Sequence, residues 1–371
     1  MVIRYTPDKM GSYAADDVVF LLRDLSHIEM EKSVEERERN IQLGTMHYSE
    51  MLPIEYQPSE HYLTLYHKIL EANARRVAEN VAIVCEKIIA HRSLNELVLV
   101  SLARAGTPIG ILMKRYIKKF HHVNVPHYSI SIIRDRGIDE TALRYIFEQH
   151  PNANVQFVDG WTGKGAITKE LGAAVANWNA TSDDKLDASL AVLADPGHSA
   201  HFYGTQEDFL IPSACLNSTV SGLVSRTVLN EAFLEKGDFH GAKYYKELEP
   251  YDVSNAYLRA VTAYYTPELQ EVAQCVLETE PIRAEPTWEG LKNIEAIQQA
   301  FQIQNIHHVK PGVGETTRVL LRRIPWKILV NPHSKQDLSH ILLLAEQRGV
   351  EVESYEQMTY ACCGLIKDVI R

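Results

Sequence analysis

The sequence predicts an α/β protein with a mostly parallel sheet and a small C-terminal α/β/α domain. Three observations predict this fold. Short, continuously apolar runs alternate with segments of helical periodicity between residues 69 and 194. Polar, often glycine-containing loops follow the apolar runs, as in the crossover units of parallel sheets. After a charged stretch with two prolines at 278–286, a second and shorter alternation begins.

The first alternation forms the predicted core. Apolar spacing predicts a helix over 69–90, and the continuous runs predict strands at 97–102, 127–133, 155–158 and 188–194, with helices at 109–120, about 139–149 and 166–178 between them. Because helices join successive strands, we expect parallel strands in a Rossmann-like sheet that is buried on both faces. Residues 240–275 are also predicted to be helical.

The second alternation predicts a smaller unit. Helices are expected at 288–302, 315–323 and 337–347 and strands at 327–330 and 350–355, and the last residues are predicted to be helical. We therefore divide the chain into a core domain at 1–277, a linker at 278–287 and a C-terminal domain at 288–371.

Bulk properties narrow the class of protein. The chain has 371 residues, of which 45% are hydrophobic and 23% are charged, values typical of globular proteins. No apolar run is long enough to span a bilayer, and residues 1–5 lack the apolar core of a signal peptide. We expect a cytoplasmic protein without a membrane anchor. The five cysteines lack C-x-x-C spacing, so neither a disulfide framework nor a zinc site is expected.

A glycine-rich loop follows the predicted strand at 155–158. Asp159 ends the strand, and Thr162, Gly163, Lys164 and Gly165 lead into a helix. Glycines let the backbone approach a ligand closely, and free N–H groups at a helix N-terminus attract phosphate. The loop is therefore predicted to bind a phosphate at the carboxyl edge of the sheet. The alternative is an ordinary strand–helix turn.

Two further loops are expected at the same edge. The first contains Ser101, Arg104, Ala105 and Gly106, whose main-chain N–H groups and guanidinium suit a diphosphate. The second contains Arg134 and Arg136, which also suit a polyanion. The alternatives are a surface charge at Arg104 and a salt-bridged turn around Asp135.

An irregular segment follows the fourth predicted strand. Asp195 ends that strand and is a candidate Mg²⁺ ligand or a cap of the next turn. Residues 207–227, here called the hood, are too irregular for a core helix and too apolar for a linker. Long loops of this kind are often functional, so the hood is predicted to cover the site.

The strand, acid and glycine-rich loop resemble the phosphoribosyl-diphosphate signature of phosphoribosyltransferases. This resemblance implies a phosphoribosyltransferase-type core that transfers the sugar phosphate of 5-phosphoribosyl diphosphate, with Mg²⁺, to a base-like acceptor. It implies that Asp159 holds the ribose and, with Asp195, the metal. It also implies that residues 162–165 hold the 5-phosphate and that Arg104, Arg134 and Arg136 hold diphosphate. Gly160 departs from the pattern, because the usual motif has a second acid there.

Three segments resemble a bacterial family linked to tellurite-resistance and stress gene clusters. They are Gly11–Val18, Gln42–Pro53 and Ile211–Leu223. Members of this family are called phosphoribosyltransferase-like proteins and also StiP cysteine proteases. The main hypothesis is the transferase. One alternative is a cysteine peptidase in which Cys215 is the nucleophile and His198 or His201 is the base. Another is a non-catalytic nucleotide- or RNA-binding regulator, and a homo-oligomer is compatible with each.

The C-terminal domain resembles Pelota-type RNA-binding domains. Gly312–Arg318 is similar to their G-x-N-E-x-x-K motif, with Gly314 in place of the asparagine and Arg318 in place of the lysine. Arg318, Arg322 and Arg323 form a basic cluster that is expected to contact the phosphates of structured RNA. The alternative is an ordinary accessory domain with a solvated helix.

Overall fold

The structure is a computed structural model that describes residues 6–366, apart from the side chains of His61 and Arg322. Its centre is a six-stranded sheet in the order β1-β6-β5-β9-β10-β11, and all neighbouring strands are parallel. The strands are β1 (Val19–Phe20), β5 (Leu97–Leu102), β6 (His127–Ile130), β9 (Asn154–Val158), β10 (Leu190–Ala194) and β11 (Phe202–Thr205). The predicted parallel sheet is confirmed.

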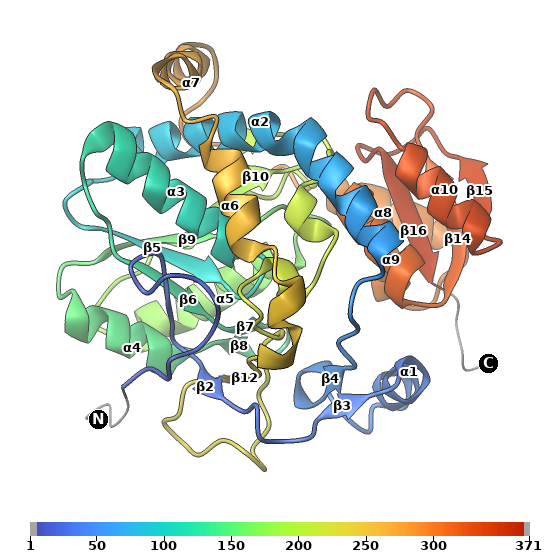
Figure 1. The fold of residues 1–371 in the computed structure, drawn as a ribbon, viewed down its shortest axis with the longest axis horizontal. Helices are drawn as coiled ribbons and strands as arrows, with labels where there is room; N and C mark the ends of the chain where they lie inside the picture. The colour runs from blue at the N-terminus through green and yellow to red at the C-terminus, as the bar shows by residue number, and fades with distance from the viewer. Residues whose placement is uncertain (1–5, 367–371) are drawn as a thin grey trace.

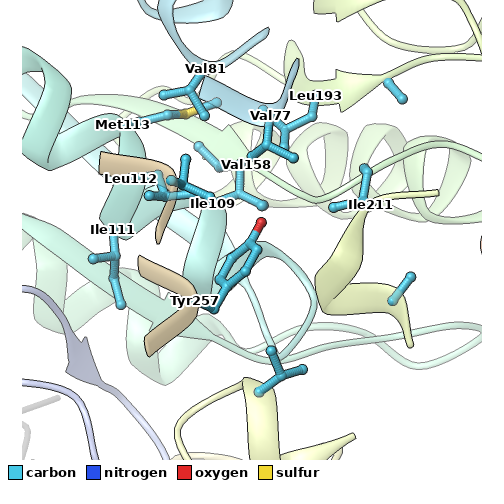
Figure 2. Packing of buried hydrophobic residues seen from close by; sticks show 14 of the residues in the cluster. Val77, Val81, Ile109, Ile111, Leu112, Met113, Val158, Leu193, Ile211 and Tyr257 are labelled. Carbon is cyan, nitrogen blue, oxygen red and sulfur yellow. The ribbon is translucent and has the colours of Figure 1, made fainter. Parts of the chain in front are cut away.

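Helices cover both faces of this sheet (Figure 1). One face carries α2 (Glu60–His91), α3 (Gly106–His121) and α6 (Ser254–Thr262), and the other carries α4 (Glu140–Gln149) and α5 (Ala166–Thr181). Figure 2 shows the first of these layers, where Val77, Ile109 and Tyr257 pack together with Leu193 of the sheet. Burial on both faces explains why the strands are continuously apolar.

Shorter elements surround the hood and the N-terminal part of the core. The paired strands are β2 (Arg23–Asp24) with β12 (Gly241–Ala242), β3 (Glu31–Lys32) with β4 (Leu52–Pro53), and β7 (Ile132–Ile133) with β8 (Gly137–Ile138). The helical pieces are α1 (Val34–Leu43), η1 (Tyr48–Glu50), η2 (Pro212–Ala214), η3 (Ser218–Val220), η4 (Lys246–Tyr251) and α7 (Pro267–Thr279). Continuous helix over 240–275 was a wrong prediction, since β12, η4 and two separate helices lie there.

The C-terminal domain has its own four-stranded sheet in the order β13-β16-β14-β15. Its elements are α8 (Glu289–Ala300), η5 (Ile306–His308), β13 (Val309–Pro311), α9 (Val313–Arg322), β14 (Pro325–Val330), α10 (Ser339–Gln347), β15 (Glu351–Ser354) and β16 (Cys362–Ile366). The small C-terminal domain is thus confirmed. The predicted terminal helix is wrong for residues 362–366, which form a central strand, and residues 367–371 lie outside the described part.

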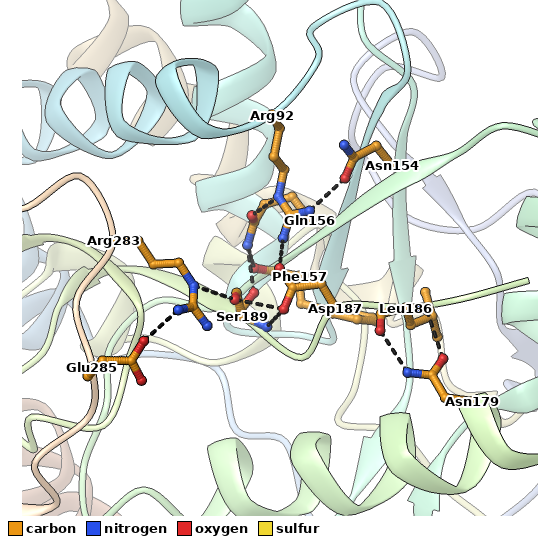
Figure 3. Close-up of polar contacts among 10 residues, drawn as sticks. All are labelled: Arg92, Asn154, Gln156, Phe157, Asn179, Leu186, Asp187, Ser189, Arg283 and Glu285. Atoms are coloured by element: carbon orange, nitrogen blue, oxygen red, sulfur yellow. Dashed lines mark hydrogen bonds and ion pairs between the residues drawn. The ribbon is translucent and has the colours of Figure 1, made fainter.

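The amino ends of the strands are held by a buried polar network around Arg92 (Figure 3). Its guanidinium donates to Gln156 Oε1, Asn154 Oδ1 and Asp187 Oδ2, each at 2.6 Å. Arg92 follows the last residue of α2, so the network fixes this long helix to β9. Hydrogen bonds to charged groups are among the stronger ones in proteins.

The predicted linker is attached along the same end of the sheet. The Arg283 guanidinium donates to Ser189 Oγ at 3.2 Å and is paired with Glu285 (Figure 3), and the Ala284 N–H donates to the His201 carbonyl at 2.8 Å. This segment is therefore packed on the core. Among the described helices, none is long and apolar enough to cross a membrane.

Candidate functional site

A cavity of ≈ 280 Å³ lies at the carboxyl edge of the central sheet. Its polar lining consists of Arg104, Asp159, Asn217, Arg226 and Arg318. These residues come from the loops after β5 and β9, from the hood and from α9. The carboxyl ends of parallel strands are the usual ligand-binding edge of such sheets, which makes this cavity the candidate site.

The loop after β5 brings Arg104 to the cavity. Its guanidinium donates to Asn217 Oδ1 at 2.6 Å and to a main-chain carbonyl of the hood, that of Val224, at 3.1 Å. Burial lowers the pKa of Arg104. The rest of the loop is packed, because Ser101 Oγ lies 2.8 Å from His127 Nε2 and is fully buried. Only Arg104 and Ala105 of the predicted loop residues line the cavity.

Asp159 is the acidic group of the cavity. Its Oδ1 accepts a hydrogen bond from the Gly160 N–H at 2.7 Å. Removal from water raises the pKa of Asp159 to about 7, although the nearby Arg318 opposes the shift. A carboxyl group with this pKa exchanges a proton at neutral pH, as general acids and bases do.

Arg226 is a hood residue for which the sequence predicted no role. Its Nη2 donates to the main-chain carbonyls of Tyr48 and Met51. Burial, together with the charge of Arg37, lowers the pKa of Arg226 to about 9. The sequence did contain one indication of this role. Arg226 is an arginine in an apolar, serine-rich segment, and such a segment is expected to be buried together with the charge of the arginine.

Arg318 reaches the cavity from the C-terminal domain. It is ion-paired with Glu315 at 3.0 Å and lies over the Trp161 ring, 4.8 Å from the centroid. Burial would raise the pKa of Glu315, but Arg318 and Lys310 more than offset this and lower it. The predicted motif at 312–318 therefore faces the core. Within the predicted basic cluster, Arg323 is ion-paired with Glu38 of α1 at 2.7 Å.

The glycine-rich loop is covered by the C-terminal domain. The Tyr360 hydroxyl donates to the Gly163 carbonyl at 3.1 Å, and Lys164 Nζ donates to the Ile306 carbonyl at 2.8 Å. A β-carbon on Gly165 would lie 2.5 Å from the Trp288 ring. Burial lowers the pKa of Lys164 to about 7. The loop thus serves as a docking surface rather than as an open phosphate cradle.

The remaining predicted residues of this edge are engaged in internal contacts. Thr162 donates to the Asp195 carboxylate, which also accepts the N–H groups of Ser199 and Ala200. Asp195 therefore caps the turn that follows β10, which was the alternative for this residue. Among the described residues, no group of three or more His, Cys, Asp and Glu could hold a metal ion. Mg²⁺ binding stays a prediction.

Arg134 and Arg136 lie in the β7–β8 hairpin. Arg134 is paired with Asp135 at 3.1 Å and lies near His307 of the C-terminal domain, and Arg136 is ion-paired with Glu50. These contacts fit the alternative for these residues, which was a salt-bridged turn. Neither arginine lines the cavity.

Cys215 lies two residues before Asn217, which lines the cavity. It ends η2, is 1% exposed, and its carbonyl accepts a hydrogen bond from the Tyr62 hydroxyl at 2.6 Å. Burial raises the pKa of the nearby Tyr66 and Tyr257, and a negative charge on Cys215 adds to both shifts. Asn217, two residues further on, lines the cavity, so the two Cα atoms are at most roughly 7 Å apart.

The two histidines predicted as bases lie elsewhere. His201 precedes Phe202, whose ring is 5.4 Å from that of His91 at the end of α2. Cys215 contacts Tyr62 in the first turn of the same helix, and roughly 40 Å of helix separates the two points. His201 as the base of Cys215 is therefore a wrong prediction. His198 is paired with Glu289 of α8 at 3.4 Å.

Comparisons with known proteins match both parts of the chain. The model of the family described as "Tellurite-like stress resistance cysteine protease StiP" matches residues 11–262. The model described as "PELOTA RNA binding domain" matches residues 288–368. "Cysteine protease StiP" of Acinetobacter baylyi is 34% identical over 336 residues, which cover 88% of this chain and 85% of that protein.

These matches overturn the transferase hypothesis. The family and the relative are both described as cysteine proteases, so the expectation of a phosphoribosyltransferase that uses phosphoribosyl diphosphate is wrong. The structure agrees with this correction, because the C-terminal domain covers Gly163 and Gly165 of the loop that was expected to bind phosphate. The resemblance to the StiP family and to Pelota-type domains is confirmed.

Proposed function

Because the chain belongs to the StiP family of tellurite-like stress resistance cysteine proteases, we propose that it is a cysteine peptidase with Cys215 as its nucleophile. The family model covers residues 11–262, and this range contains two cysteines, Cys85 and Cys215. Cys85 is fully buried in the middle of α2, and burial raises the pKa of its thiol well above the usual range. The observation that carries the proposal is that Asn217, two residues after Cys215, lines the cavity.

In the proposed reaction, the Cys215 thiolate attacks the carbonyl carbon of a peptide bond. The amine leaves as a thioester forms, and water then cleaves the thioester to give the free acid and the thiol. A base has to take the thiol proton and return it to the leaving amine, and histidine suits this role near neutral pH.

Two histidines near the start of α2 are the candidates that we propose to test for this base. Tyr62 of this helix donates to the Cys215 carbonyl, and Tyr66 lies one turn further along. His61 directly precedes Tyr62 in the chain, and the ring of His67 lies 5.3 Å from that of Tyr66. Replacing each histidine by alanine tests which one the reaction needs.

Substrate entry requires the cover of Cys215 to move. Cys215 is 1% exposed, and Ala214 next to it lies 3.3 Å from where a β-carbon on Gly314 of α9 would be. The hood and the C-terminal domain are the segments that close this route. Lid movements of this kind are common in enzymes that exclude water from the reaction.

The test compares two cysteine variants on a library of fluorogenic peptides. C215A is expected to lower kcat/KM by at least about 10³-fold, because the nucleophile is lost. C85A, which changes a cysteine buried in α2, is the matched control and is expected to keep most of the activity. Full activity of folded C215A would refute the assignment.

We also propose that the C-terminal domain binds RNA, as the description of its matching model indicates. The match over residues 288–368 is the observation that favours this second function. Fluorescence anisotropy with a structured RNA and the full chain tests it. Binding that weakens as salt rises is expected for phosphate contacts, and no binding at low salt would refute it.

A further inference from the structure

The cavity gathers positive charge that its own walls neutralise only in part. Arg104 donates to Asn217 Oδ1 and to a main-chain carbonyl, and Arg226 donates to two main-chain carbonyls. Within the described residues, neither guanidinium is ion-paired with a carboxylate. Arg318 adds a third guanidinium, which is paired with Glu315. This concentration stands out in a chain whose net charge is −10.

The nearest acids supply only part of the missing charge. Glu55 acts on the pKa of Arg104 from a distance, but its Oε1 accepts the N–H of Ser218 at 2.9 Å and its hydroxyl at 2.7 Å. Asp159 is only partly ionised at neutral pH, since its pKa is raised to about 7 by removal from water. A buried charge without a counter-ion is costly, so an anion that enters the cavity is stabilised there.

Two donors of the cavity arginines are unused. Arg226 Nε and Arg318 Nε are buried, and neither has a hydrogen-bond partner among the described atoms. Both residues line the cavity. Guanidinium groups pair with the two oxygens of a carboxylate in a planar, charge-assisted arrangement. The cavity therefore offers the positive charge that a carboxylate requires, and two further N–H donors are buried in its wall.

We propose that this cavity is the specificity pocket of the peptidase and that it takes the carboxylate of an aspartate or glutamate side chain of the substrate. The proposal rests on the proposed function, which brings a peptide to Cys215. At ≈ 280 Å³ the cavity is small for a nucleotide-sized ligand and suits one side chain. Asn217 joins pocket and nucleophile, because it binds Arg104 and lies two residues from Cys215.

Binding to the full chain with the C215A substitution measures the pocket separately from catalysis. The probes are two fluorescent peptides that differ only in one residue, glutamate or glutamine, at varied positions along the sequence. The glutamate peptide is expected to bind between about 10- and 150-fold more tightly at one position, the range for hydrogen bonds to charged groups. Wild-type protein is expected to show the same preference in kcat/KM.

Two changes test the arginines. Adding R226Q to C215A removes one guanidinium, and adding E315Q with R318Q removes the other together with its partner, so that no buried carboxylate is left unpaired. Each is expected to abolish most of the preference for glutamate while the glutamine peptide binds as before. Thermal unfolding identifies any variant that does not fold, and the other variant then decides.

The outcomes separate the two proposals. Equal binding of the two peptides at every position would overturn the pocket, and so would cleavage by wild type without preference for an acidic residue. A phosphoserine peptide or inorganic phosphate that binds in the cavity while the glutamate peptide does not would also overturn it. Preferential binding of the glutamate peptide without any cleavage would support carboxylate binding in the cavity and would refute the assignment of the chain as a peptidase.

Discussion

A single buried carboxylate, that of Asp208, connects the two parts of the chain. It accepts hydrogen bonds from the N–H groups of Val313 at 2.9 Å and Ala361 at 2.8 Å, both in the C-terminal domain. Burial raises the pKa of Asp208 to about 6, although these N–H groups oppose the shift. The contact between the two domains therefore depends on a hood carboxyl group whose ionisation is opposed by burial.

This pKa predicts a specific pH dependence of stability. Because the pKa of Asp208 is higher in the folded chain than in the unfolded one, its contribution is complete below about pH 4 and is lost as pH rises through about 6. The loss is on the order of 3 kcal/mol. D208N is expected to flatten this part of the pH profile, as measured by urea unfolding at pH 4 and pH 7.5. An unchanged profile would contradict the assignment.

Individual site residues were predictable only in part. Arg104 and Asp159 follow two buried strands, and the rule that the carboxyl ends of parallel strands share one edge brought them together correctly. Arg226 and Arg318 were missed as partners of the cavity. They lie 92 positions apart in the chain and converge through contacts of the hood with α9, which no local pattern encodes.

At the scale of elements, the start of α5 is fitted to the C-terminal domain. Gly165 precedes this helix with φ = +76°, a conformation that side chains disfavour, and a β-carbon there would overlap the Trp288 ring. Both features require glycine at this position. The helix start and the packing of Trp288 thus depend on one residue.

G165A is therefore expected to destabilise the chain by at least about 1 kcal/mol, from the left-handed backbone alone. G172A is the matched control in the same helix, because no neighbouring atom lies within 4 Å of the added β-carbon. It is expected to stabilise the chain by up to about 1 kcal/mol through helix propensity. Thermal unfolding of both variants decides, and an equal effect of the two changes would contradict this account.

Helices and strands were predicted well where polar residues flank an apolar run on both sides. The strands β5 and β9 were predicted in this way, since burial on both faces makes each run continuous and glycine-containing loops end it. The β16 strand was missed, because Cys362–Ile366 is equally buried but periodicity alone does not separate a short apolar strand from a helix. Neighbouring strands decided its conformation.

At the scale of the whole molecule, the C-terminal domain is docked onto the glycine-rich loop and beside the hood. Tyr360 reaches Gly163 and Gly314 reaches Ala214, contacts that join segments more than 90 residues apart. The sequence predicted two domains but not that one would complete a cavity of the other. The boundaries at 277 and 288 and the phosphoribosyltransferase type of the sheet stay predictions.

Covalent labelling with a peptide inhibitor identifies the cysteine that attacks the substrate. A peptide that carries glutamate and an electrophilic ketone is incubated with wild-type protein, and the modified cysteine is identified by mass spectrometry. The account predicts a label on Cys215, formed faster than with the glutamine peptide. Cys275, which is exposed on α7, serves as the internal reference for unassisted reactivity. A label confined to Cys275, with Cys215 unmodified in active protein, would contradict the account.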